Sequence, residues 1–401
     1  MAIKSDFPIL SQKIRGNSIV YLDSAASAQK PEMVINAVSD FYRSSYENVH
    51  RGMNSLSINA TDIYERSRSA CADFIKASST NSVIFTRGAT DSINLIANTI
   101  AQQLEEGDEI ITTEIEHHSN FLPWMNICKN HKLQFKVIPA SANGLIDEDE
   151  IIQSCTSKTK IIAITHMSNV TGQIINVKKI KDSVDKNILL AVDGCQAIAH
   201  IKVDVKELNC DFYSFSSHKL YGPSGIGVLY GKEELLNKLN PVVVGGGMIN
   251  QVSINDFSYA MLPNKFEAGT PSIEAAAGFG AALKYLNQID FEKTFLEEKK
   301  LRQSLIESMS AMEGIEMYGI DNSIFASSII SFNVQNKNFN DIATFLDQYG
   351  IMIRGGHHCC QPLMKKLNIP GSCRLSLGIY NTMEDVSKFL DSLKKTINLL
   401  S

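Results

Sequence analysis

The sequence lacks the features of membrane-spanning, fibrous and disordered proteins. Among its 401 residues 44% are hydrophobic, but no run approaches the roughly 18 consecutive apolar residues that a membrane span needs. The segment Met1 to Pro8 contains no apolar stretch suited to a signal sequence, so we predict a cytoplasmic protein. Only 20% of the residues are charged and 8% aromatic, and a chain of this length and composition can bury a sizeable core.

An excess of charge of one sign is also missing. Lys and Arg total 38 against 43 Asp and Glu, which leaves a formal net charge of -5. This balance gives no electrostatic reason to bind nucleic acid or an anionic membrane, so we predict neither as a partner. Small-molecule chemistry is the better expectation.

The cysteines do not have the spacing of a disulfide framework. They are scattered over the chain, at positions 71, 128, 155, 195, 210, 359, 360 and 373. We expect reduced thiols, most of them buried as small apolar side chains. Cys359 is an exception because of the residues around it.

Short apolar runs alternate with amphipathic stretches up to about residue 290. The runs typical of buried strands are Ser82–Thr86, Glu109–Thr113, Phe135–Pro139, Lys160–Thr165, Ile188–Val192, Asp211–Ser216 and Gly225–Tyr230. Helical patterns such as Ser92–Leu104 and Val177–Asp185 lie between most of them. This alternation predicts an α/β architecture around a mostly parallel sheet of seven strands flanked by helices. Ligands of such sheets bind at the carboxyl ends of the strands, where the chain has Thr86, Thr113, Thr165, Asp193 and Ser216.

From about Asp290 the pattern changes to that of a second, smaller α+β domain. The predicted elements are a charged helix over Phe291–Met312, a strand over Ile329–Val334, a helix over Asp341–Tyr349, a strand over Ile351–Arg354 and a helix from Met383. We therefore predict a large domain over residues 18–289 and a small domain formed by residues 1–17 and 290–401. A helix over Ser272–Leu286 is expected at the junction.

Ser216 to Lys219 lies between an apolar strand and a turn rich in glycine and proline. A lysine there can form an imine with a carbonyl cofactor, while Ser216 and His218 hold an anion. Asp193 ends another apolar strand and needs a cationic partner, such as a protonated pyridine nitrogen, unless it only caps the following turn. Together these residues predict pyridoxal phosphate as the cofactor, with Gln196 donating toward its phenolic oxygen.

Two turns that contain glycine could hold the phosphate of such a cofactor. Thr86 to Asp91 places Thr90 at the start of a helix, and Phe266 to Pro271 offers Thr270 as an N-cap before a proline. A purely structural helix start would have the same sequence, so each turn alone leaves that alternative open.

His117 and Asn169 follow two further strands at the same predicted edge. The imidazole of His117 could stack on a pyridine ring, and the amide of Asn169 could face the ring hydroxyl. A capping or solvated role, or metal binding with His118, is the alternative for His117. A simple polar turn is the alternative for the Asn169 segment.

Arg354 to Pro362 combines two glycines, two histidines and two adjacent cysteines. The glycines predict a loop free to move, and Arg354 with the histidines would favour a thiolate, so Cys359 is a candidate nucleophile. The alternative is a metal site made of His357, His358, Cys359 and Cys360. Arg374 lies early in an apolar run, where a buried guanidinium needs an anion such as a substrate carboxylate.

Taken together, these segments resemble the cysteine desulfurases of the class V aminotransferase-like fold, and most of all the SufS type. The resemblance runs almost from end to end. It rests on Tyr21–Ser27, Val49–Gly52, Glu116–His118, Thr165–Val170, Ser216–Pro223, Phe266–Pro271 and Arg354–Cys359.

The resemblance implies a fold type I pyridoxal phosphate transferase and a set of roles. The cofactor, pyridoxal 5'-phosphate, would be bound by Lys219, His117, Asp193, Gln196 and Asn169. Its phosphate would be held by Thr90, Ser216 and His218, together with Gly269 and Thr270 of the other subunit of a homodimer. The substrate would be bound by Arg374, with Arg354, His50 and Asn169 lining the pocket, and the catalytic residues would be Lys219, Cys359 and His117.

The implied reaction converts L-cysteine to L-alanine and leaves a persulfide on Cys359. A SufE-like or SufU-like acceptor would then take the sulfur to the scaffold proteins of iron–sulfur cluster assembly. Selenocysteine or cysteine sulfinate as substrate, an aminotransferase or hydrolase activity, and a non-catalytic metal-binding protein are the alternatives. Cys360 departs from the family pattern, and it could fill space, compete for the persulfide or form an oxidised off-state with its neighbour.

Overall fold

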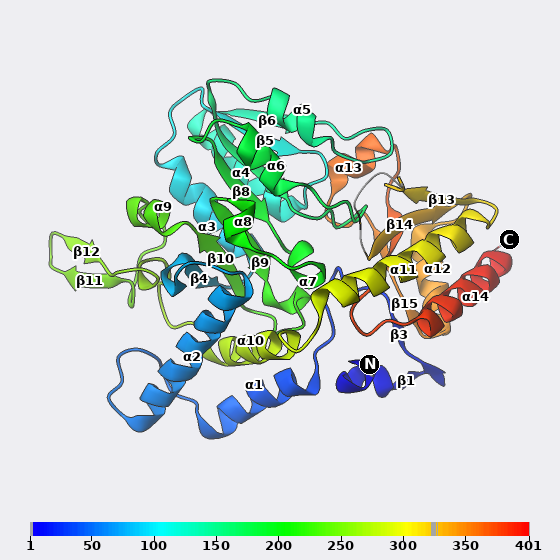
Figure 1. Ribbon diagram of the computed structural model, residues 1–401, viewed down its shortest axis with the longest axis horizontal. Helices are drawn as coiled ribbons and strands as arrows, with labels where there is room; N and C mark the ends of the chain where they lie inside the picture. The colour runs from blue at the N-terminus through cyan, green and yellow to red at the C-terminus, as the bar shows by residue number, and fades with distance from the viewer. Residues whose placement is uncertain (1–2, 322–325, 327, 401) are drawn as a thin grey trace.

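The computed structural model describes residues 3–321, 326 and 328–400 (Figure 1). The predicted domain ranges also include residues 1–2, 322–325, 327 and 401, which lie outside the described residues. Figure 1 shows a larger part around a central sheet and a smaller part, with the C-terminal helix, on its right.

A seven-stranded sheet forms the centre of the larger part. Its strands are β4 (Val83–Thr86), β5 (Glu109–Thr113), β6 (Gln134–Ile138), β7 (Thr159–Thr165), β8 (Leu189–Asp193), β9 (Phe212–Ser216) and β10 (Gly227–Gly231). They lie in the order β4-β10-β9-β8-β7-β5-β6, and only β10 runs antiparallel to its neighbours. The prediction of a mostly parallel seven-stranded sheet is therefore confirmed.

Alternate side chains of these strands enter two different cores, as the two-residue period of a strand requires. Ile110 and Ile161 pack on one face, whereas Ile111 and Ile162 pack on the other. The first face is covered by α3 (Ala89–Ala101), α4 (His118–His131) and α9 (Glu233–Lys238). The second is covered by α1 (Glu32–Ser44), α2 (Ser55–Phe74), α5 (Glu148–Gln153), α6 (Val177–Ser183), α7 (Ala197–His200), α8 (Val205–Leu208) and α10 (Ile273–Leu286).

The smaller part contains an antiparallel sheet and a core of its own. The sheet has the order β13 (Ile315–Tyr318), β14 (Ile329–Val334), β17 (Ser372–Ser376) and β16 (Arg354–Gly356). Its core includes side chains of α11 (Phe291–Ser310), α12 (Phe339–Gln348) and α14 (Met383–Leu399). The short α13 (Gln361–Lys366) follows β16 after a loop.

The predicted strand Ile351–Arg354 is wrong in one respect, since the structure divides it in two. β15 (Ile351–Met352) pairs in parallel with β3 (Val20–Tyr21), whereas β16 joins the four-stranded sheet. The N-terminal segment therefore pairs with a strand of the smaller part before it reaches the larger one. The division into residues 18–289 and 1–17 with 290–401 stays a prediction.

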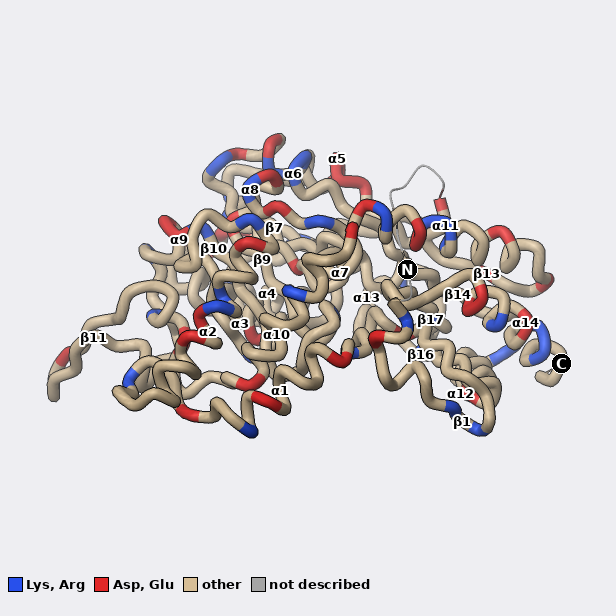
Figure 2. Tube along the Cα trace, turned by 60° about the horizontal axis from the view of Figure 1, so that its bottom comes forward, with Lys and Arg blue, Asp and Glu red and all other residues tan. Residues whose placement is uncertain are grey.

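Two hairpins complete the strands. One joins β1 (Lys13–Ile14) to β2 (Asn17–Ser18), and the other joins β11 (Ile249–Val252) to β12 (Phe257–Tyr259). The second hairpin projects from the larger part at the left of Figure 1. Among the described residues, no helix is long and apolar enough to cross a membrane. Basic and acidic residues are interspersed along the chain (Figure 2).

Candidate active site

The strand ends bring several predicted site residues to one edge of the large sheet. Thr86 of β4 and Ser216 of β9 both lie opposite Gly227 of β10, and Thr165 of β7 lies opposite Asp193 of β8. The ends of β4, β9, β8 and β7 are therefore close together, as the sequence predicts for a ligand site of a parallel sheet.

Lys219 lies at the end of the short 3-10 helix η4 (Ser217–Lys219), directly after β9. The Oγ atom of Ser216 accepts a hydrogen bond of 2.8 Å from the main-chain N–H of Ala89, the first residue of α3. Thr90 follows at the exposed start of that helix, where its Oγ1 lies 2.7 Å from Ser119 Oγ. Free N–H groups and the positive end of a helix dipole suit a phosphate at this position.

His218 is held next to the same strand end by the N-terminal segment. Its Nδ1 lies 3.3 Å from Ser27 Oγ, and its carbonyl oxygen accepts the N–H of Ala28 at 3.0 Å. Burial lowers the pKa of His218, and together with the positive charges of Lys219 and Lys30 it brings this pKa to about 4. The ring is therefore neutral at neutral pH and can donate one hydrogen bond.

Asp193 has a buried carboxylate at the end of β8, with only 4% of the residue exposed. Its Oδ1 accepts the N–H of Cys195 at 2.9 Å, and no ion pair of the described part of the chain involves it. A Cβ atom on Gly194 would lie 2.0 Å from the ring of Tyr213, so only glycine permits this turn. A buried carboxylate without a cation fits a protonated ring nitrogen.

Two predicted amide donors contact main-chain carbonyls. Gln196 Nε2 donates to the oxygen of Ala25 at 2.9 Å, and Asn169 Nδ2 donates to the oxygen of His358 at 2.8 Å. Because each amide nitrogen carries two hydrogens, each side chain keeps a second donor.

His117 is the N-cap of α4, and its Nδ1 accepts the N–H of Ser119 at 3.1 Å. Burial lowers the pKa of this imidazole to about 3, and the positive charges of Lys219, His118 and Arg374 act in the same direction. His117 therefore stays neutral over the physiological range, and it lies within electrostatic reach of Lys219.

Cys359 is exposed on the loop between β16 and α13. Hydrogen bonds attach this loop to two segments of the larger part, the start of α4 and the turn after β7. Its carbonyl oxygen accepts the N–H of His118 at 2.7 Å, while the preceding carbonyl, that of His358, is bound by Asn169. Its own N–H donates to His357 Nδ1 at 3.1 Å. These bonds hold the thiol beside the start of α4.

The two glycines of this segment lie in a strand and not in the loop itself, and the mobility expected of the loop stays a prediction. Gly355 and Gly356 belong to strand β16, whereas His358 and Cys359 take the left-handed backbone conformation, each with a φ of 52°. Such φ values are uncommon for residues with side chains and persist only where the surroundings impose them. The hydrogen bonds from His118 and Asn169 provide that constraint.

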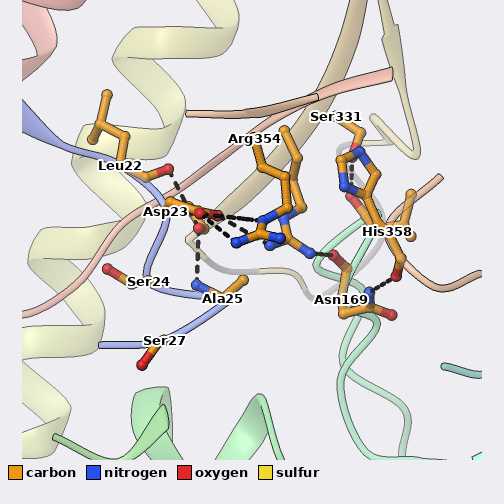
Figure 3. A network of polar contacts seen from close by, with 12 residues as sticks. Leu22, Asp23, Ser24, Ala25, Ser27, Asn169, Ser331, Arg354 and His358 are labelled. Carbon is orange, nitrogen blue, oxygen red and sulfur yellow. Dashed lines mark hydrogen bonds and ion pairs between the residues drawn. The ribbon is translucent and has the colours of Figure 1, made fainter. Parts of the chain in front are cut away.

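Arg374 and Arg354 lie opposite each other on β17 and β16, and they share the carboxylate of Asp23 (Figure 3). Arg374 donates to Asp23 Oδ1 at 3.2 Å and to the carbonyl oxygen of Asn169 at 3.1 Å. Arg354 donates to both oxygens of Asp23, at 2.9 to 3.2 Å. The Nε atom of Arg374 is buried without a partner, so the guanidinium can still accept an anion.

Cys360 differs sharply from its neighbour. It is fully buried in the core of the larger part, with its Sγ 3.8 Å from the carbonyl oxygen of Glu114, and burial raises the pKa of its thiol. A buried thiol with a raised pKa is a poor nucleophile. These contacts favour the space-filling interpretation.

The remaining predicted residues form a second group. His50, Gly269 and Thr270 line one pocket, and no hydrogen bond of the described residues joins it to Lys219 or Cys359. The predicted helix start at Thr270 is also wrong, because α10 begins at Ile273 with Ser272 as its N-cap. The N–H of Gly269 instead donates to the oxygen of Gly246 at 2.8 Å.

Asp23 is the residue that sequence reasoning missed. It directly follows the apolar run Ile19 to Leu22 and therefore carries the same signal as Asp193, a carboxylate at the end of a buried run. Among the described residues, no group of three or more His, Cys, Asp or Glu could hold a metal ion.

Comparisons with known proteins agree on one family. The class V aminotransferase model matches residues 20–389. A probable cysteine desulfurase of Staphylococcus aureus is 47% identical over 99% of this chain and 96% of its own length. The crystal structure of the cysteine desulfurase CsdA of Escherichia coli has a TM-score of 0.91 at 35% identity, covering 99% of this chain and 98% of the other. The apo cysteine desulfurase of Thermococcus onnurineus has a TM-score of 0.93 at 35% identity, covering 99% and 97%.

The residues at the sheet edge fit pyridoxal 5'-phosphate. Asp193 offers a buried carboxylate to the ring nitrogen, Lys219 an amine at the same edge, and the start of α3 a phosphate site. The chain therefore belongs to the class V aminotransferase family, among its pyridoxal phosphate-dependent cysteine desulfurases.

Proposed function

We propose that the chain takes the sulfur atom from L-cysteine, releases L-alanine and keeps the sulfur as a persulfide on Cys359. The observation that carries the proposal is the hydrogen bond from the N–H of His118 to the carbonyl of Cys359, at 2.7 Å. It ties the exposed Cys359 to the residue that follows His117, whose imidazole lies within electrostatic reach of Lys219. The resemblance to the SufS type supports assignment to that group.

Pyridoxal phosphate, when bound, supplies an electron sink for charge that develops on the substrate. Lys219 is the amine that holds the cofactor and then moves the proton of the substrate α carbon. The neutral ring of His117 would stack on the cofactor ring, and the carboxylate of Asp193 would pair with the ring nitrogen. The second N–H groups of Gln196 and Asn169 would be available to donate to the ring oxygen.

Cys359 performs the sulfur transfer. Its thiolate attacks the substrate sulfur, so that a sulfur–sulfur bond forms while the bond from sulfur to Cβ breaks. The electron pair of the broken bond stays with the substrate carbon, which gains a proton and leaves as alanine. Arg354 and Arg374 both lie within electrostatic reach of Cys359. Arg374 binds the substrate carboxylate through its unpartnered Nε.

The phosphate would be held by Thr90, Ser216 and His218 and, in a homodimer, by Gly269 and Thr270 of a second copy. His50 then lines the substrate pocket of that second copy. Exposed apolar side chains on α1, α2 and the β11–β12 region support dimerisation; they are Ile35, Tyr42, Tyr46, Met53, Leu56, Ile58, Val242, Val243, Val244, Val252, Ile254, Phe257 and Met261.

A persulfide on an exposed cysteine would react with thiols in solution. Its outer sulfur must therefore be transferred to a partner protein. We assign this step to a SufE-like or SufU-like acceptor that serves the scaffold of iron–sulfur cluster assembly. The eight free cysteines are in keeping with a reducing cytoplasm. The proposed catalytic cysteine belongs to the small domain of residues 1–17 and 290–401, and the cofactor site to the large domain of residues 18–289.

The test is the release of alanine and sulfide from L-cysteine by the purified protein, with and without candidate acceptors. Borohydride reduction should bleach the yellow colour and leave an adduct that maps to Lys219. The variant Lys219→Ala should lose all activity. A colourless protein, or one that exchanges amino groups with an α-keto acid instead of releasing sulfide, would contradict the proposal.

A further inference from the structure

Two guanidinium groups and one carboxylate form a compact charged cluster beside Cys359. Arg354 and Arg374 are paired across β16 and β17, and Asp23 lies between them with ion pairs of 2.9 and 3.2 Å (Figure 3). His358 adds no charge at neutral pH, because burial lowers the pKa of its imidazole to about 3. The cluster therefore carries one net positive charge.

The main chain fixes the position of the carboxylate. Asp23 forms a β-bridge with Ser376, and Ser376 Oγ accepts the N–H of Ala25 at 2.9 Å. Asp23 is thus attached to β17, the strand that carries Arg374. Its side chain is only 14% exposed, which strengthens its interaction with both guanidinium groups.

The same cluster continues to the cysteine loop. Arg374 donates to the carbonyl of Asn169, and the amide of Asn169 donates to the carbonyl of His358, the residue before Cys359. A ligand that binds Arg374 through its free Nε therefore lies close to the loop that carries Cys359. Any second charge on that ligand is felt by Arg354, which is half exposed and close to the same thiol.

We propose that Asp23 is a specificity-determining residue. It cancels one of the two arginine charges, and so matches the site to a substrate with a single carboxylate and an uncharged sulfur. A substrate whose side chain carries a second negative charge, such as cysteine sulfinate, is disfavoured because only one net positive charge is present. The inference rests on the proposed role of Arg374 as the carboxylate-binding residue.

Two substitutions change the net charge of the cluster in opposite directions. Asp23→Asn gives the cluster a net charge of two positive units, whereas Arg354→Gln makes its net charge zero. We would titrate each holoenzyme with L-alanine and with L-aspartate, following the cofactor absorbance, and compare the two dissociation constants. We would also compare kcat/KM for alanine formation from L-cysteine and from L-cysteine sulfinate.

Asp23→Asn should raise the affinity for L-aspartate relative to L-alanine about tenfold, and kcat/KM for L-cysteine sulfinate relative to L-cysteine by a similar factor. Arg354→Gln should lower both ratios. Asp347→Asn, which removes a carboxylate from an exposed ion pair with Arg15, is the matched control and should leave both ratios unchanged. Equal ratios in all proteins, or shifts of the same sign in both site variants, would overturn the inference. If Asp23→Asn does not fold, the shift of Arg354→Gln decides alone. If no alanine forms from L-cysteine, the proposed function fails, and the binding ratios still decide on Asp23.

Discussion

The main-chain N–H of His118 donates a hydrogen bond of 2.7 Å to the carbonyl oxygen of Cys359. His118 is the first residue of α4, and the N–H groups of a first helical turn have no partner inside their own helix. The bond therefore satisfies a free donor and fixes the cysteine loop at once. It joins the loop after β16 in the smaller part to the start of α4 in the larger part, where the proposed cofactor and nucleophile meet.

His118→Pro should weaken sulfur transfer without disturbing α4. Proline removes the N–H but is well tolerated at the first helical position, and His117 already has the extended backbone, with φ -60° and ψ 145°, that a residue before proline prefers. Loss of the tether should lower the kcat for alanine formation by roughly 10–100-fold, since small misplacements of reacting groups have effects of that size. Cofactor absorbance should stay unchanged.

His118→Ala is the matched control for this change, because it removes the same imidazole, and its bond from the N–H of Gln361, but keeps the main-chain donor. It should retain most of the activity. If the alanine and proline variants lose activity equally, the imidazole and not the tether is the important group.

Most of the large sheet could be predicted because its strands are short apolar runs, five of which end at a polar residue. Thr86, Thr113, Thr165, Asp193 and Ser216 all end strands where the sequence predicts. The division of Ile351–Arg354 into two strands could not be predicted, since it depends on pairing with β3, more than 300 residues away, as its register shows. Local patterns carry no information on such partners.

The two adjacent cysteines should respond differently to replacement by serine. Cys359→Ser should abolish alanine formation from L-cysteine, because a hydroxyl cannot hold the transferred sulfur. Cys360→Ser should keep activity but lose about 1–3 kcal/mol of stability, because it places a hydroxyl in an apolar core. Alanine assays and denaturant unfolding separate the two effects, and an inactive Cys360→Ser alongside an active Cys359→Ser would reverse our assignment.

Glu116 should make the protein less stable as the pH rises. Burial raises its pKa from 4.5 to about 8, against the opposing hydrogen bonds from Asn120 and Thr113. The folded chain therefore keeps a proton that the unfolded chain releases between these two values, so stability should fall by about 1.4 kcal/mol per pH unit across that window. Denaturant unfolding at pH 5 and pH 8 measures the loss.

Glu116→Gln should remove this pH dependence. The neutral amide can accept from Asn120 and donate to the hydroxyl of Thr113, so its contacts survive. Glu106→Gln, in an exposed pair with Lys132, serves as a control that should behave like the unaltered protein. An unchanged slope in Glu116→Gln would show that Glu116 is ionised in the folded state at neutral pH.

The candidate site was predictable where one side chain alone shows its chemistry, as with Lys219 and Cys359. Asp23 was missed because its importance lies in its partners, and the bonds to Arg354 span 331 positions. The anchoring of Cys359 was missed for the same reason, since main-chain donors leave no trace in the sequence. Residue type thus indicated the proposed reacting groups, whereas their placement depended on contacts between distant segments.

The proposed dimer makes a prediction about mixed subunits. If Thr270 contributes to the phosphate site of the other subunit, Thr270→Asp should inactivate that site because its carboxylate repels the phosphate. Lys219→Ala should inactivate the site of its own subunit because the amine is lost. In a dimer of one chain of each kind, one site carries both defects and the other carries neither. Refolding an equal mixture should therefore restore about one quarter of the normal activity, because half of the dimers are mixed and each has one intact site.

A loop that serves its own chain gives the opposite result, because each site of the mixed dimer then carries one defect and the mixture stays inactive. Thr270→Ser keeps the hydroxyl and should remain active, which separates the introduced charge from any general intolerance of the loop. Regained activity would also explain why His50 and Thr270 share a pocket apart from Lys219 in one chain, since both would act on the site of the partner.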